Sequence, residues 1–537
     1  MEALTSIKHA VAAAPTETAI VISIVAVLLG IYVMLTRKPK YDLDKMDGAW
    51  KKASPVLGNV LELLTPNFHR KFLQWSDKFG GINRFKFLWH DVVLVTDPTA
   101  LGVIMGRGEG AVDKAFETYA PINKMCDPHG QPNLLTAQAD DRWKAIRKAV
   151  AVSFSAQNIK RKFPMILERV NEVVRRSAKL GPKASIDVDQ TALRVTLDVI
   201  GLAGFNHDYG CVHKDVPEYE HLIRVLPRCF TEVMLRVANP LRPIFPNWFK
   251  GGDKGAKAFA MFQAEMRTLL NEMKQRGPPP EDDQDIAAQL YRVMSENPSI
   301  CEDRILSEIG MLFVEGFETT GHTTSWTLFN IASVPGVQDK IAEELDSLGL
   351  LAKPGCPPPK ELQLDDLKRV PYLVAATKEA MRMLPVVSIM GRCAGLRWMT
   401  TKTTKIGSYT VPPGTIVATP LFAIQNTIHN WDKPEDFTYV YDSTTNTSGG
   451  KRGITFMPFS EGPRNCVGQS LAKMEVLTLL AKLVGNFHLE LAQEMGGRAG
   501  VISRESTHLT LQSAGTKGIR CHLHPRSENV AAGIVAA

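Results

Sequence analysis

The segment FSEGPRNCVGQSLA, residues 459–472, places a cysteine, Cys466, two positions after an arginine and two before a glycine. Glycine and proline in this loop favour a tight, irregular backbone, and the apolar pattern of QSLAKMEVLTLLAKLV after it predicts a helix. The sulfur is therefore expected near a helix N-terminus. There the positive end of the helix dipole and the free N–H groups favour a thiolate over a thiol.

A thiolate in this setting suits either a nucleophile or a ligand for a soft metal. A nucleophile would need a histidine as its base, and the loop contains none. Arg464 instead offers a fixed cation beside the sulfur. An iron porphyrin meets both conditions, because its iron accepts a sulfur ligand and its propionates pair with arginine. The loop thus predicts a haem site with Cys466 as the metal ligand.

The other cysteines show no CxxC pair and no zinc-ligand spacing, a pattern that suits a reducing compartment. We interpret them as small buried residues or idle thiols. They are Cys126, Cys211, Cys229, Cys301, Cys356, Cys393 and Cys521.

The elements that must position this loop are mostly helices. Residues 163–180, 259–276 and 335–350 show the i, i+3, i+4 apolar spacing of amphipathic helices. Residues 82–97 have a strand-like pattern, and residues 508–524 predict a hairpin about a glycine-containing turn. The sequence therefore predicts a mainly α fold, that is, a helix-rich α+β protein with small sheets.

Composition excludes several classes of protein. The chain has 537 residues, of which 44% are hydrophobic and 22% charged, as in a globular protein with a large core. No long Gly/Ser linker or repeat divides it, so one large domain is expected. The net charge of +7 is spread over 63 basic and 56 acidic residues, without a basic run interleaved with aromatics. We therefore expect no nucleic-acid partner.

An apolar stretch, AIVISIVAVLLGIYVML at residues 19–35, predicts a single membrane-spanning helix of about 26 Å, which suits a thin bilayer such as that of the endoplasmic reticulum. More basic side chains follow it closely than precede it, which places the rest of the chain in the cytosol. A cleaved signal peptide is the alternative, but the stretch is long for one and no small-residue cleavage site follows. A plastid membrane is the alternative location.

Six residues of the cysteine loop follow the pattern F-x-x-G-x-R-x-C-x-G-x-x-x-A: Phe459, Gly462, Arg464, Cys466, Gly468 and Ala472. This spacing resembles the cysteine loop of the cytochrome P450 family of haem-thiolate monooxygenases. The resemblance implies that Cys466 ligates the iron and that Phe459, Arg464 and Gly468 contact the haem. It also implies the P450 fold, with a membrane anchor at 1–36, a catalytic domain at 37–526 and a tail at 527–537.

Two further motifs match that family. KEAMR resembles its E-x-x-R, so Glu379 and Arg382 are expected to hold the proximal side of the fold, although this spacing alone is typical of an exposed ion pair. DRWKAIRK resembles its W-x-x-x-R. By that resemblance Trp143 and Arg147 lie at the haem, and Arg147, Arg392 and Arg464 pair with its propionates.

The segment VEGFETTGHTTSW, residues 314–326, lies in a helical pattern although its two glycines and four threonines cost about 4 kcal/mol of helix propensity relative to alanine. Tight helix packing at the glycines would be one explanation. The segment also resembles the family's (A/G)-G-x-(D/E)-T-T. That resemblance implies that Gly316 lines the oxygen groove, that Glu318 is the acid of a proton relay, and that Thr319 hydrogen-bonds the oxygen being activated.

Glu315 occupies a position where much of the family has a small residue, on the same helix face as Thr319. A buried carboxylate must be protonated, paired or chemically consumed. In the fatty-acid ω-hydroxylase branch, a glutamate in the motif E-G-H-D-T-T forms an ester with a haem methyl group. This chain has E-G-F-E-T-T, a partial match. The alternative is a carboxylate hydrogen-bonded to a water or to a polar group of the substrate.

One motif departs from the family pattern. The chain keeps Trp431, Pro434 and Phe437 of W-x-x-P-x-x-F, but no arginine follows until Arg452. The third member of the family's Glu-Arg-Arg triad is therefore either relocated or missing.

These features predict a membrane-anchored monooxygenase that inserts one atom of O2 into an apolar substrate: a lipid, fatty acid, terpenoid, carotenoid or sterol. The chain has no flavin- or nicotinamide-binding glycine motif, so electrons must come from a separate NADPH-dependent flavoprotein reductase, or from a ferredoxin in a plastid. By analogy the pocket wall includes residues 126–135, 314–319, 386–390 and 503–508. Two alternatives keep the fold: an isomerase or dehydratase acting on a hydroperoxide, against which the acid–threonine pair argues, and a non-enzymatic haem sensor or carrier.

Overall fold

The computed structural model describes residues 41–108, 111–114, 119–181, 183–213, 217–239, 241–388, 397–399, 403–437, 453–513 and 518–533. The predicted anchor at 1–36 lies outside these residues, as do Arg392 and Arg452. Across the described ranges, no helix combines the length and the apolar character needed to cross a bilayer.

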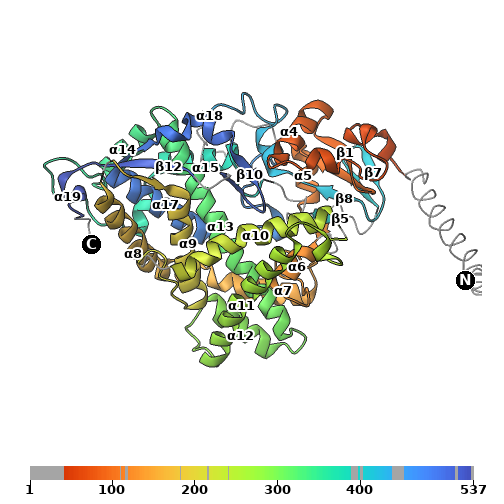
Figure 1. Ribbon diagram of the computed structural model, residues 1–537, viewed down its shortest axis with the longest axis horizontal. Helices are drawn as coiled ribbons and strands as arrows, with labels where there is room; N and C mark the ends of the chain where they lie inside the picture. Colours follow the sequence, from red (N-terminus) through yellow and green to blue (C-terminus); the bar gives the residue numbers. More distant parts are fainter. Residues whose placement is uncertain are drawn as a thin grey trace, which may run out of the picture.

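Helices make up most of the described chain (Figure 1). The longer ones are α4 (Phe68–Phe79), α7 (Asp141–Ser153), α8 (Ala156–Leu180), α9 (Val188–Phe205), α10 (Pro217–Ala238), α11 (Gly252–Arg276), α12 (Ile286–Glu296), α13 (Glu302–Ser333), α14 (Val337–Ser347), α15 (Pro371–Met383) and α17 (Gln469–Asn486). The short ones are α3 (Val60–Leu63), α5 (Pro98–Ile104), α6 (Ala120–Cys126), α16 (Leu421–Asn426), α18 (Gly497–Ile502) and α19 (Glu528–Ala531). The predicted helices at 163–180, 259–276 and 335–350 are confirmed as parts of α8, α11 and α14.

The strands form small sheets, as expected. One sheet has the order β1-β2-β8-β5-β3, and it consists of β1 (Ile82–Phe87), β2 (His90–Val95), β8 (Ile416–Ala418), β5 (Arg397–Met399) and β3 (Asp113–Lys114). A second has the order β4-β12-β9, from β4 (Ser185–Asp187), β12 (Arg520–Pro525) and β9 (Phe487–Leu491). Two strand pairs complete the set, β6 (Thr404–Ile406) with β7 (Tyr409–Val411) and β10 (Glu505–Thr507) with β11 (Leu511–Ser513). The strand-like run at 82–97 is confirmed as the antiparallel pair β1–β2.

The hairpin predicted at 508–524 is wrong. Its two halves do contain strands, but β11 pairs with β10, while β12 pairs with β4 and β9. Alternation of apolar and polar residues indicates that a segment is extended and half-buried, but it does not identify the neighbouring strand. Partners distant in sequence, such as Cys521 with Ile186 and Leu491, were therefore invisible to a local pattern.

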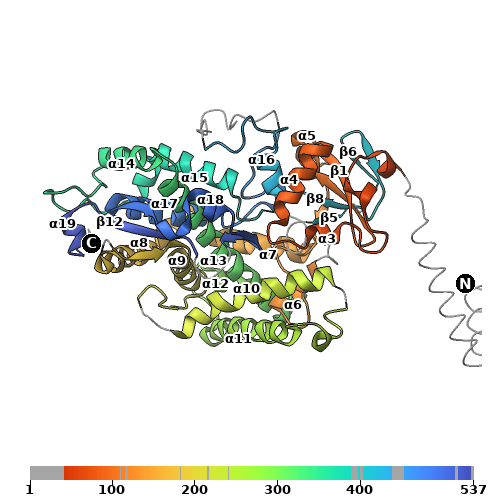
Figure 2. The same cartoon turned by 45° about the horizontal axis from the view of Figure 1, so that its top comes forward.

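Helix α13 runs through the middle of the molecule and packs most closely against α9 (Figures 1 and 2). The two glycines of the segment at 314–326 allow this approach. A Cβ at Gly316 would lie 2.5 Å from Ile200 Cδ1, and one at Gly321 would lie 2.7 Å from Leu193 Cδ2. The tight-packing explanation for these glycines is therefore confirmed.

The threonines of α13 are accommodated by hydrogen bonds along the helix. Thr319 Oγ1 donates to the Glu315 carbonyl at 2.6 Å, and Thr323 Oγ1 donates to the Thr319 carbonyl at 2.7 Å. Because each hydroxyl finds an acceptor one turn earlier, it can be buried without a desolvation penalty. Tertiary packing and these bonds together offset the poor helix propensity of the segment.

Glu379 and Arg382 form a buried network rather than a solvated surface pair. Their side chains are 4% and 1% exposed, and Arg382 Nη2 donates to Glu379 Oε1 at 2.8 Å. The same guanidinium donates to three backbone carbonyls, those of Gln425 at 3.0 Å, Pro434 at 2.9 Å and Asp436 at 3.2 Å. It thereby joins α15 to α16 and to the 434–436 segment.

We expect Arg382→Ala to lower the free energy of unfolding by about 3–5 kcal/mol, because it removes one partner of a buried ion pair together with the guanidinium that binds three backbone carbonyls. Guanidinium chloride denaturation measures the change. Lys368→Ala is the matched control, since it removes a cation from an exposed pair with Asp365 and should change the free energy by about 0.5 kcal/mol or less. A loss for Arg382→Ala no larger than for the control would show that this network does not hold α15 in place.

Candidate active site

The cysteine loop is a tight backbone structure that ends at α17. The N–H of Cys466 donates to the Phe459 carbonyl at 2.9 Å, and Gly468 is the residue before the first turn of α17. Gly462 has φ +70°, and a Cβ there would lie 2.0 Å from the Met105 carbonyl oxygen. Glycine is therefore required at 462, and the predicted position of the sulfur near a helix N-terminus is confirmed.

The electrostatic expectation for this sulfur needs correction. Burial, together with the Glu315 carboxyl, raises the pKa of the Cys466 thiol to about 11, although the Gly468 N–H and the cations Arg147 and Lys473 favour the thiolate. The field of the loop alone therefore does not produce a thiolate, because desolvation outweighs it. The Cys466 side chain nevertheless has accessible surface, because it faces an internal cavity. A metal cation bound in that cavity would supply the missing stabilisation.

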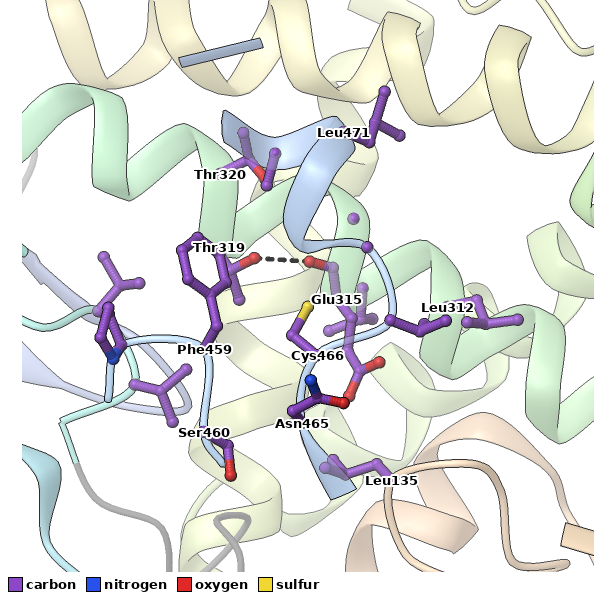
Figure 3. A pocket seen from close by; sticks show the side chains of 18 of the residues that line it. Leu135, Leu312, Glu315, Thr319, Thr320, Phe459, Ser460, Asn465, Cys466 and Leu471 are labelled. Atoms are coloured by element: carbon purple, nitrogen blue, oxygen red, sulfur yellow. Dashed lines mark hydrogen bonds between the residues drawn. The ribbon is translucent and has the colours of Figure 1, made fainter. Parts of the chain in front are cut away.

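The cavity has a volume of about 220 Å³ and lies between α13, α7 and the cysteine loop. Most of the predicted site residues line it (Figure 3). They are Trp143, Arg147, Glu315, Gly316, Thr319, Phe459, Arg464, Cys466 and Gly468. Segments more than 300 residues apart in the chain thus meet at one site, as the motifs predicted.

Three cations line this cavity: Lys114, Arg147 and Arg464. Arg147 Nη2 donates to Asn465 Oδ1 at 2.7 Å, and the Arg464 guanidinium lies 4.1 Å from the centre of the Trp143 ring. Trp143 is in turn fixed by its indole N–H, which donates to the Leu134 carbonyl at 2.9 Å. The W-x-x-x-R motif therefore both supplies one cation and orients another.

Lys114 was not found by sequence reasoning. It lies on β3 with its side chain 1% exposed, and its ammonium is 5.5 Å from the centre of the Tyr119 ring. Burial lowers the pKa of Lys114 well below its ordinary value, and nearby Arg464 lowers it further, whereas Glu315 opposes the shift. No motif marks this lysine in the sequence; only the pairing of β3 with β5 carries it into the interior.

This set of residues fits a haem. Cys466 offers a sulfur ligand, and the cations offer partners for two propionates. Nη1 of Arg464 is buried and has no hydrogen-bond partner among the described residues, which is costly unless a ligand supplies an acceptor. Burial likewise lowers the pKa of Arg147, so an anion beside it would relieve an unfavourable charge.

Glu315 and Thr319 lie on α13 with Cys466 close by, as Figure 3 shows. The dashed line in that view is the bond from the Thr319 hydroxyl to the Glu315 carbonyl. Burial raises the pKa of the Glu315 carboxyl to about 7, whereas Lys114 and Arg147 act in the opposite direction. Glu315 is therefore a carboxyl whose charge depends on the cations around it.

Glu318 does not line the cavity. It is 3% exposed, and its Oε1 lies 3.6 Å from Nε2 of His322, one helical turn later. His322 Nδ1 in turn lies 2.8 Å from Asp189 Oδ1 on α9. The sequence singled out Glu318 but gave no sign of these two partners.

The predicted pocket wall is partly confirmed. Leu134, Leu135, Val314, Val386 and Val387 line the cavity. From the segment after α18, however, Leu509 and Thr510 line it rather than residues 503–508. The lining residues differ from the predicted ones because residues 505–507 form the strand β10, which is buried and pairs with β11.

Comparisons with known proteins agree with this arrangement. The family model "Cytochrome P450" matches residues 50–500. The chain is 25% identical to rat cytochrome P450 4V2 over 86% of this chain and 88% of that protein. It is 23% identical to bovine cytochrome P450 3A28 over 78% and 80%, and 24% identical to cytochrome P450 705A12 of Arabidopsis thaliana over 85% and 87%.

With a family model that spans most of its length and a cavity where a cysteine faces a cluster of cations, this chain belongs to the cytochrome P450 family of haem-thiolate monooxygenases.

Proposed function

We propose that this enzyme inserts one oxygen atom of O2 into an apolar lipid-like substrate, with its haem held through Cys466. The observation that carries this proposal is the position of the sulfur: it faces a cavity that three cations line and that the distal helix α13 closes. A bound haem would supply the oxidising chemistry, in which O2, two electrons and two protons yield one oxygen atom in the substrate and one molecule of water.

The residues divide into two groups. Arg147, Arg464 and Lys114 would pair with the propionates, and Trp143 orients Arg464 by stacking. Phe459 lines the cavity, its carbonyl accepts from the N–H of Cys466, and the N–H of Gly468 donates to the sulfur. These contacts hold the cofactor in one orientation and stabilise the negative charge on the ligand.

On the distal side, Thr319 lines the cavity, and Glu318, the next residue toward the N-terminus, would pass protons toward it. Hydroxylation consumes two protons for each pair of electrons, so proton delivery must be directed to the right oxygen atom. Gly316 lines the cavity on the same helix and would lie beside the oxygen path. This acid–threonine pair favours a monooxygenase over an isomerase or dehydratase.

The substrate is expected to be apolar, because the cavity wall is largely aliphatic. Leu134, Leu135, Ile200, Val386 and Leu509 contribute to it. Small-molecule sites usually combine such a wall with a few polar groups that fix orientation. Fatty acids, terpenoids, carotenoids and sterols all satisfy this requirement.

The electron donor is proposed to be an NADPH-dependent flavoprotein reductase, or a ferredoxin in a plastid. A second hollow, of about 630 Å³, lies on the outer side of the cysteine loop, and Lys378 and Lys473 line it. The Lys473 ammonium also lies 5.2 Å from the centre of the Phe459 ring. A basic hollow this close to the sulfur suits an acidic redox partner.

Attachment to the endoplasmic reticulum membrane through the span at residues 19–35 is proposed from the sequence. Exposed apolar side chains gather on two segments that support it, namely Val56, Leu57, Leu61 and Leu64, and Leu241, Ile244, Phe245 and Trp248. The segments are neighbours, because Met234 and Val237 of α10 pack against the core of the α3–α4 region. Such a surface would rest on the bilayer next to the anchor.

Cys466→Ala should abolish the strongly red-shifted Soret band that the ferrous carbonyl complex of a haem-thiolate protein shows, because the thiolate ligand is lost. Absorption spectra of the reduced, carbon monoxide-treated protein measure it. Cys126→Ala is the control and should keep the band. Persistence of the band in Cys466→Ala would remove the basis of the proposed site.

For Glu315 we expect a charge-pairing role rather than an ester. Lys114 and Arg147 favour the charged form of the Glu315 carboxyl, and an ester would remove that charge. Acid-denatured protein taken after turnover should therefore release its haem freely in both the wild type and Glu315→Ala, as followed by mass spectrometry. Haem retained on the wild-type chain but not on Glu315→Ala would establish the ester and contradict the charge-pairing role.

Removal of residues 1–36 should weaken membrane attachment without loss of haem, since that segment adds nothing to the described core. Carbonate extraction of membranes measures attachment, and the carbonyl spectrum measures haem. A truncated protein that folds but stays in the pellet like the full chain, or one that cannot hold haem, would contradict the anchor assignment.

A further inference from the structure

Three ionisable side chains form a buried cluster between α13 and α9, and none of the three lines the cavity. They are Glu318 and His322 on α13 and Asp189 on the first turn of α9, and they are 3%, 1% and 7% exposed. Glu318 alone belongs to the motif that the family resemblance picked out. The cluster is therefore a feature of this chain that the proposed mechanism has not yet used.

His322 is held more firmly on one side than on the other. Its Nδ1 lies 2.8 Å from Asp189 Oδ1, a hydrogen bond of normal length. Its Nε2 lies 3.6 Å from Glu318 Oε1, which is a charge contact but too long for a hydrogen bond. Asp189 thus fixes the ring, and the ring presents its other nitrogen to Glu318.

The charges of the cluster follow from this arrangement. Burial opposes protonation of His322, but Asp189 outweighs it, and Glu318 adds to the effect, so the pKa of His322 is raised to about 10. Burial acts to raise the pKa of Asp189, but the charge and hydrogen bond of His322 outweigh burial, so this pKa is lowered. At neutral pH the pair is therefore an imidazolium with a carboxylate, and Glu318 faces a permanent cation.

Other ionisable groups near the cluster do not change this. His508, from the loop after β10, is the other imidazole near Glu318; burial lowers its pKa, so it is neutral at pH 7. Asp187, which caps α9 and is close to Asp189, has a pKa raised to about 6, mainly by burial. Neither supplies a positive charge at pH 7, so His322 is the cation that faces Glu318 within the described residues.

Glu318 also has an unsatisfied atom. Its Oε2 is buried and makes no hydrogen bond with any described residue, and the same holds for Nε2 of His322. A carboxylate held by charge on one oxygen and free on the other can exchange a proton without first breaking a hydrogen bond. Thr319, the next residue along the chain, lines the cavity, so the acid is the neighbour in sequence of a residue at the cavity wall.

We propose that His322, fixed by Asp189, is the positioning residue of the proton relay: its imidazolium holds Glu318 next to Thr319 as a carboxylate ready to take up and pass on a proton. The proposal rests on the assignment of Glu318 as the relay acid. No bond other than those to the proton is made or broken. The proton moves from solvent to Glu318 and from Glu318 toward the cavity, and His322 keeps its own.

The charge of Glu318 can be measured without turnover. Infrared difference spectra of the resting holoenzyme at pH 7, with and without ¹³C-labelled glutamate, detect a protonated glutamic acid by its carbonyl stretch. Glu318 should give no such band in the wild type. His322→Gln removes the cation and should add the band, and the double variant His322→Gln with Glu318→Gln should lose it again. His508→Gln is the matched control, since it removes a neutral imidazole next to the same acid and should add no band.

Proton delivery is tested with NADPH and reductase in the absence of substrate. Two electrons and two protons convert O2 into hydrogen peroxide, and four of each convert it into two water molecules, so the share recovered as water reports on the relay. We expect this share to fall about tenfold in Glu318→Gln and in His322→Gln, with no further fall in the double variant. His322→Lys keeps a cation at this position and should restore part of the share.

The outcomes are distinguishable. The proposal would be overturned if His322→Gln gave no new infrared band. It would also be overturned if His322→Gln gave the new band but left the share of O2 recovered as water unchanged, while Glu318→Gln lowered that share. An unchanged share in Glu318→Gln would refute the relay assignment itself and the inference with it. If His322→Gln fails to fold because Asp189 is left unpaired, Asp189→Asn with His322→Gln gives a neutral pair of the same shape, for which the same band and the same fall are expected.

Discussion

Desolvation of positive charge is the constraint on which the site depends. Lys114, Arg147 and Arg464 are drawn into one cavity from three distant parts of the chain, and burial lowers the pKa of each. A protein tolerates this only where an anionic ligand compensates for the cost. The haem propionates are suited to that role. Cofactor binding is therefore expected to contribute to the stability of the fold as well as to its chemistry.

The same principle explains the cysteine. Burial raises the pKa of its thiol to about 11, so stabilisation of the thiolate falls to a metal cation. Ligand and cofactor thus stabilise each other: iron favours the thiolate, and the thiolate holds the iron. The loop contributes geometry, through Gly462 against the Met105 carbonyl and through the N–H of Gly468, rather than a preformed charge.

The sequence predicts those residues of the site that belong to a short local motif and misses those that do not. Cys466, Arg464, Trp143 and Arg147 lie in short motifs with fixed spacing, and the structure brings all of them to one cavity. Lys114 lies in a two-residue strand with no motif, so no local signal marked it.

Long-range pairings were likewise hidden from the sequence. The contact of Asp189 with His322 joins residues 133 positions apart. The pairing of β12 with β4 and β9 escaped prediction for the same reason, because it depends on tertiary contacts rather than on periodicity. Glu379 and Arg382 were identified correctly, but their burial followed only from the carbonyls of the 425 and 434–436 segments that surround the guanidinium.

Gly316 shows why packing and chemistry cannot be assigned to separate residues of α13. Gly316 lines the cavity, and a Cβ there would meet Ile200 of α9 at 2.5 Å. The close approach of α9 that this glycine permits also brings Asp189 on α9 within reach of His322 on α13. A substitution at Gly316 would push α9 away and would disturb both the cavity wall and the contact between Asp189 and His322. In this helix the glycines set the distance between α9 and α13, and that distance determines whether the buried carboxylate, imidazolium and acid can act together.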